Sequence, residues 1–154
     1  RDYSKVVREA GFQNALETNG MINPEAFKTL LETMDMVNID YKGFSEEFYR
    51  EYLQGDYQSV LDNIAILAKS GVYYEVTCLI VANVNDNDAE FDKGMQALQQ
   101  VAPEAPINLL AVVPRNKEEL EMVPSIEKMN DLLEIAKKYF AQVQIVDREK
   151  APQW

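Results

Sequence analysis

The sequence has 154 residues, of which 26 are acidic, 15 are basic and none is histidine, and its formal net charge is −11. This acidity disfavours nucleic acid as a partner, because phosphate binding needs clustered lysine and arginine. One cysteine and no histidine exclude a Ser–His or Cys–His nucleophile, a zinc site of Cys and His, and an iron–sulfur cluster bound by this chain alone, which needs several thiolates.

The length suits one domain with a hydrophobic core, and a content of 47% hydrophobic residues is that of a globular protein. We expect a single α/β domain over residues 1–150 and a polar tail over 151–154. No apolar run is long enough to span a bilayer, no signal peptide opens the chain, and the lone Cys78 has no partner for an internal disulfide. These features favour the cytoplasm. Because the first residue is Arg rather than Met, we expect a processed chain or a fragment.

Short β-favouring segments alternate with amphipathic helices along the whole chain. A helix is predicted over 3–10, and others follow, each between two strands, over about 24–34, 58–70, 89–101 and 124–140, with a further short helix from Ser45. Strands are predicted over 12–18, 36–41, 73–81, 107–113 and 143–147. Asn23 and Pro24 give the second helix a clear start, because they suit the N-cap and first helical positions.

This alternation predicts about five βα units in a parallel sheet with right-handed crossovers, either as an open α/β sheet or as part of a (β/α)8-type barrel. The strand over 73–81 is almost continuously apolar, which predicts burial on both of its faces.

Ligands of parallel α/β folds sit at the carboxyl ends of the strands, so the residues there are the candidates for a site. Asp40 and Lys42 are two positions apart, and a strand would project both to the same side. A carboxylate and an ammonium on one face would clamp the two ends of an amino-acid-like ligand. The alternative is an ordinary ion pair at a strand end, which contributes at most about 1 kcal/mol when exposed.

Two other polar segments have simpler explanations. Asn19 and Gly20 form a common turn dipeptide. Asn83, Asn85 and Asp86 are an oxygen-rich group that lacks the spacing of an EF-hand, so a helix-capping turn is favoured over a cation site.

Three segments, in this order and spacing, resemble a known family. They are ETNG at 17–20, VNIDYKGFSEEFYR at 37–50 and YYEVTCLIVANVND at 73–86. They are similar to segments of the radical S-adenosylmethionine (SAM) enzymes, and most similar to the group of the pyruvate formate-lyase-activating enzymes. The resemblance extends over about residues 8–115 and implies a partial TIM barrel, here strands three to seven of the family.

The resemblance also implies a function and a set of ligands. A full-length relative would cleave SAM reductively at a [4Fe-4S] cluster to give a 5′-deoxyadenosyl radical, for use on a substrate or on a partner protein that it activates. The cluster-binding CxxxCxxC loop of the family is not in this sequence, so this chain alone is expected to be inactive. The residues that the resemblance places near SAM or substrate are Glu17, Thr18, Asn19, Asp40, Lys42, Thr77 and Asn108.

Three hypotheses follow. The first is the C-terminal part of a radical SAM enzyme. The second is a non-catalytic half-barrel for binding or assembly, whose open sheet edge is covered by a missing N-terminal half or a dimer mate. The third is Schiff-base chemistry at Lys42, which would need a desolvated lysine with a lowered pKa. The neighbouring Asp40 carboxylate works against this, because it favours the charged ammonium.

Overall fold

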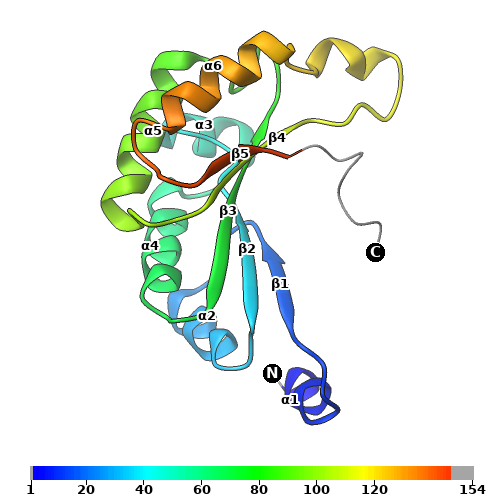
Figure 1. The fold of residues 1–154 in the computed structure, drawn as a ribbon, viewed down its shortest axis with the longest axis vertical. Coiled ribbons are helices and arrows are strands. Elements are labelled where there is room, and N and C mark those ends of the chain that lie inside the picture. Colours follow the sequence, from blue (N-terminus) through cyan, green and yellow to red (C-terminus); the bar gives the residue numbers. More distant parts are fainter. Residues whose placement is uncertain (1, 147–154) are drawn as a thin grey trace.

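The computed structural model describes residues 2–146, which form one sheet of five parallel strands in sequence order (Figure 1). The strands are β1 (Ala15–Thr18), β2 (Met36–Asp40), β3 (Tyr73–Ile80), β4 (Ile107–Ala111) and β5 (Val143–Ile145). The predicted α/β class and the parallel sheet are confirmed. The expected tail at 151–154 and the predicted strand end at Asp147 lie outside the described residues.

Helices alternate with these strands as predicted. They are α1 (Asp2–Glu9), α2 (Pro24–Leu31), α3 (Glu46–Phe48), α4 (Tyr57–Ala68), α5 (Asp88–Val101) and α6 (Ile126–Ala136), with a π-helical turn at Tyr49–Leu53 and a 3-10 turn at Glu118–Met122. Most helices begin at a polar residue whose side-chain oxygen accepts a hydrogen bond from a backbone N–H of the first turn. These N-cap residues are Asn23, Ser45, Asp56, Asn87 and Ser125. None of the helices within 2–146 has the length and apolarity that crossing a membrane would require.

One face of the sheet carries the hydrophobic core. Figure 1 shows α2, α4, α5 and α6 on the same side of the strands. The strand side chains that point to these helices are buried, among them Val37, Ile39, Val76, Cys78 and Leu109. Because side chains alternate along a strand, the residues between them must point to the opposite side. We call that opposite side the open face.

The open face does not have the burial predicted for β3. On that side Tyr73 is exposed and Glu75 and Leu79 are only half-buried, although Thr77 is buried. The prediction of burial on both faces is therefore wrong. The helices cover one side of the sheet only, so the other side of β3 stays partly exposed. The sequence did not reveal this, because apolar residues occur on both sides of β3 and mask the alternation of buried and exposed positions.

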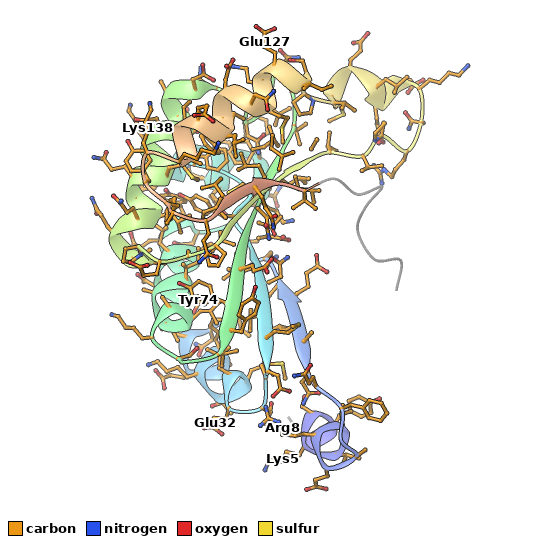
Figure 2. All side chains as sticks on the ribbon, in the orientation of Figure 1. Lys5, Arg8, Glu32, Tyr74, Glu127 and Lys138 are labelled. Atoms are coloured by element: carbon orange, nitrogen blue, oxygen red, sulfur yellow. The ribbon has the colours of Figure 1, made fainter. Side chains whose placement is uncertain are left out.

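An electrostatic contact fixes α1 at the end of the sheet where the strands begin. The Arg8 guanidinium lies 3.0 Å from Asp35 Oδ1, and it also donates to the Glu32 carbonyl at 3.4 Å. Asp35 accepts a second hydrogen bond, of 2.7 Å, from the Asn14 backbone N–H. Arg8 and Glu32 lie close together at that end in Figure 2. The contact leaves the carboxyl ends of the strands free of α1.

Gly94 provides a test of the packing between α5 and the segment that follows β2. A Cβ atom at Gly94 would lie 2.5 Å from Phe44 Cβ, which is buried. Gly94→Val is therefore expected to lower the free energy of unfolding by about 1–3 kcal/mol in urea titrations. Gln96→Val places the same side chain on the exposed side of α5 and is expected to cost less than about 0.7 kcal/mol. Equal losses for the two variants would contradict the packing described.

Candidate functional site

The open face has a hollow of about 260 Å³ where neighbouring strands bring polar side chains side by side. Parallel pairing sets Asp40 opposite Thr77 and Asn38 opposite Glu75. The hollow is lined by Glu17, Asn38, Asp40, Lys42, Glu75, Thr77, Leu79, Asn108, Leu110 and Val146. All five strands or the residues next to them contribute to it, so the register of the sheet assembles it.

An ion pair lies at the carboxyl end of β2. Lys42 Nζ is 2.7 Å from Asp40 Oδ2, and the two side chains are 33% and 18% exposed. The prediction that both project to the same side is confirmed. Because both groups are partly shielded from water, their charges are less screened than those of a surface pair. They are also open enough to meet a ligand in the hollow.

Hydrogen bonds connect the other polar side chains across the strands. Thr77 Oγ1 donates to Asn38 Oδ1 at 2.7 Å. Asn108 Nδ2 donates to Glu75 Oε2 at 2.5 Å, and Gln144 Nε2 donates to Asn108 Oδ1 at 2.8 Å. These bonds restrict the rotamers of the groups that face the hollow, so the surface offered to a ligand is pre-organised.

The structure brings together most of the residues predicted for a site. Those that line the hollow are Glu17, Asp40, Lys42, Thr77 and Asn108. Thr18 and Asn19 are not among its lining residues. Thr18 Oγ1 accepts from the Gly20 N–H at 3.2 Å, and Asn19 Oδ1 accepts from the Met21 N–H at 3.1 Å. Both side chains therefore shape the turn after β1, where Gly20 has a φ of +74°.

Sequence reasoning missed other lining residues, chiefly Asn38 and Glu75. Both have the same strand parity as Asp40 and Thr77, so the period of two was a signal that could have found them. Glu75 and Asp40 each face the open side, and together with Glu17 they set three carboxylates against the single ammonium of Lys42. The excess negative charge favours a cationic ligand.

The side chains of Asn85, Asp86 and Asn87, in the polar loop at 83–87, make hydrogen bonds to backbone groups. Asp86 Oδ1 accepts from the Asn83 N–H at 2.9 Å, and Asn87 is the residue that caps α5. Asn85 is buried and bonds to the ends of two strands. Across residues 2–146, no three His, Cys, Asp or Glu side chains come together in a way that would hold a metal ion.

A cluster of tyrosines lies under the end of β2, on the side of the helices. The Tyr41 and Tyr57 hydroxyls share a hydrogen bond of 2.5 Å, and the Tyr49 ring tilts against that of Tyr57 with 5.5 Å between centroids. Tyr41 and Tyr49 are almost completely buried. Burial raises the pKa of all three phenols above its ordinary value, because it disfavours the phenolate.

A five-stranded parallel sheet with helices on one side and a polar hollow on the other is the architecture of a partial barrel. Solved structures have a similar fold. The chain superimposes on a domain of the pyruvate-formate lyase-activating enzyme from Bacteroides vulgatus with a TM-score of 0.81 and 18% identity, covering 95% of this chain and 88% of that one. For a radical SAM methyltransferase from Sphaerobacter thermophilus the TM-score is 0.70 at 14% identity, covering 89% and 42%. For an archaeal TYW1 it is 0.65 at 16% identity, covering 97% and 48%.

Sequence comparison gives one partial relative at high identity. No protein-family model matches the sequence. An uncharacterized protein of Methanocaldococcus jannaschii is 41% identical over 86 residues, which are 56% of this chain and 25% of that protein. The chain thus spans about a quarter of the length of this relative. At the identities of the solved structures the likeness shows the fold, so the chain has a radical SAM-like fold and the resemblance seen in its motifs is confirmed at that level.

The tyrosine cluster predicts that the fold weakens in alkali. A phenol whose pKa is raised in the folded state keeps a proton that the unfolded chain releases above about pH 10. The stability from these groups is therefore complete below that pH and is lost as the pH rises through 10 and beyond, by up to about 1.4 kcal/mol per pH unit for each phenol. Urea unfolding between about pH 8 and pH 11.5 measures this slope. Tyr57→Phe is expected to make it shallower, and an unchanged slope in that variant would contradict the assignment.

Proposed function

We propose that the open face binds SAM through its amino acid end, and that this chain forms the SAM-binding wall of a radical SAM enzyme. The observation that carries the proposal is the ion pair of Asp40 and Lys42 at the edge of the hollow, with 2.7 Å between the charged atoms. An α-amino acid carries one ammonium and one carboxylate. Asp40 and Lys42 offer each of these groups an oppositely charged partner on one face.

The rest of the hollow supports a cationic ligand of this kind. The sulfonium of SAM adds a positive charge to the amino acid. Glu17 and Glu75 supply negative charges, and Lys42 is the one basic residue in the lining of the hollow. Leu79, Leu110 and Val146 give the hollow an apolar part as well, suited to the uncharged portion of a ligand.

The [4Fe-4S] cluster that the fold family implies does not fit the side chains of this chain. Its one thiol, Cys78, is fully buried on the helix side of β3, and burial raises the pKa of that thiol well above its ordinary value. A cluster needs several thiolates. We therefore assign only SAM binding to these residues. Reductive cleavage of SAM and activation of a partner protein would belong to a longer protein with cysteines outside these 154 residues.

A second candidate is a non-catalytic half-barrel that acts in binding or assembly. The observation that favours it is the outer edge of β1, which pairs with no strand among the described residues. An unpaired edge is a template for a further strand, from another segment or a second copy.

Schiff-base chemistry at Lys42 has less support. The Lys42 ammonium is already paired with Asp40, and a carbonyl compound would have to break that pair.

Calorimetric titration of SAM into this chain tests the proposal. We expect binding at one site per chain, and Asp40→Asn is expected to weaken it about tenfold to a hundredfold, the effect of losing one charged hydrogen bond. Asp92→Asn is the matched control. It removes the carboxylate of a surface pair with Lys138, 3.6 Å away, and Lys138 lies on the helix side of the sheet (Figure 2). Its affinity for SAM should equal that of the unmodified chain.

Two outcomes would contradict the proposal. One is a correctly folded chain that gives no binding heat with SAM at millimolar concentration. The other is an equal loss of affinity in the Asp40 and Asp92 variants. The first outcome would leave the binding or assembly role as the better account, and sedimentation of the chain alone would then show whether a second copy covers the edge of β1.

A further inference from the structure

The backbone of Lys42 is held by side chains rather than by a neighbouring strand. Lys42 lies two residues after Asp40, the last residue of β2, and beyond the strand pairing. The side chain of Asn85, only 4% exposed, donates a hydrogen bond of 2.9 Å from Nδ2 to the Lys42 carbonyl. The Tyr49 hydroxyl, on a side chain that is 1% exposed, accepts one of 3.3 Å from the Lys42 N–H. Both polar groups of this peptide position are thus satisfied from elsewhere in the chain.

The hydrogen bond from Asn85 to Lys42 is made in addition to two hydrogen bonds within the loop that contains Asn85. Asn85 Nδ2 donates to the Leu79 carbonyl at 2.7 Å, and Asn85 Oδ1 accepts from the Val81 N–H at 2.8 Å. Those two bonds close the loop after β3. The third bond is the one that crosses to the end of β2, so one buried amide ties together the carboxyl ends of two neighbouring strands.

The two anchors come from different directions. Asn85 belongs to the loop after β3, whereas Tyr49 begins the π-helical turn after α3. Gly43, the next residue, packs so closely against Phe48 that a Cβ there would overlap atoms of the Phe48 ring. Lys42 therefore has little freedom to shift, and its side chain leaves the backbone at a fixed point beside Asp40.

We infer that Asn85 and Tyr49 are positioning residues, which hold Lys42 so that its ammonium stays beside Asp40 in the hollow; the effect on ligand affinity rests on the proposed function. A lysine side chain has many rotamers, and a fixed backbone limits the positions that its ammonium can reach. Loss of either anchor lets the backbone at 42 move and separates the pair. Neither anchor lines the hollow itself, so each acts on a ligand through Lys42.

Selective amine labelling tests this without any ligand. The chain is treated briefly with an acylating reagent, and mass spectrometry gives the labelling of Lys42 relative to that of Lys69 in each variant. Tyr49→Phe removes the acceptor for the Lys42 N–H and keeps the ring, and Asn85→Ser shortens the second anchor. Tyr57→Phe is the matched control, because it removes a half-buried hydroxyl that bonds to Tyr41 and not to Lys42.

The expected result is a relative labelling of Lys42 about threefold to tenfold higher in Tyr49→Phe and in Asn85→Ser, the equivalent of one lost hydrogen bond, and unchanged in Tyr57→Phe. General loosening of the fold would raise the labelling of both lysines together and leave their ratio constant. Where Asn85→Ser does not fold, Tyr49→Phe alone decides. A constant ratio in the folded variants would overturn the inference.

SAM titration of the same variants separates this inference from the proposed function. Affinity is expected to fall in Tyr49→Phe by a factor similar to the labelling change and to stay constant in Tyr57→Phe. If the labelling ratio changes while affinity for SAM does not, the positioning role in binding is overturned. If the ratio changes and the unmodified chain binds no SAM, the anchoring of Lys42 is supported and the proposed function fails.

Discussion

The sheet of five parallel strands has two faces, and the helices α2, α4, α5 and α6 cover one of them (Figure 1). Alternation along each strand then divides the side chains into two sets. One set, which includes Ile39, Val76 and Leu109, is buried under the helices and supplies the hydrophobic stabilisation. The other set lies outside the core, so polar side chains are tolerated there. The hollow exists because the register of the sheet aligns that second set.

This division separates the side chains of the core from those of the hollow. The helix side holds the core, the tyrosine cluster and the buried Cys78. The open side holds three carboxylates, one ammonium and a chain of amide hydrogen bonds. The two sides meet at the end of β2, where Tyr49 comes from the packed side and the Lys42 ammonium from the polar side. The hydrogen bond to Tyr49 thereby joins the backbone of Lys42 to the core.

Local signals were enough to predict the order of the elements. Apolar periodicity placed the five strands to within a few residues, and Asn23 with Pro24 marked the start of α2. Parity also predicted that Asp40 and Lys42 share a face. By the same rule Thr18 points to the face opposite that of Glu17. In the structure its hydroxyl lies in the turn after β1, outside the hollow.

What the sequence could not predict depends on contacts between distant segments. Glu75 lies in an otherwise apolar strand. Its place in the hollow depends on the neighbouring strand, from which Asn108 donates a hydrogen bond to it. The three bonds of Asn85 join groups up to 43 positions apart, and no local pattern distinguishes it from the neighbouring loop asparagines. A polar loop residue that is buried is recognised only once burial is known.

We propose that SAM binds on the open face of the sheet and not on the helix side. The most direct measurement is a two-dimensional ¹H–¹⁵N NMR titration of the chain with SAM. We expect chemical shift changes concentrated at the backbone amides around Asp40, Lys42 and Thr77, with the amides of α2 and α4 unchanged. Shifts confined to the helices, or none at saturating SAM, would contradict it.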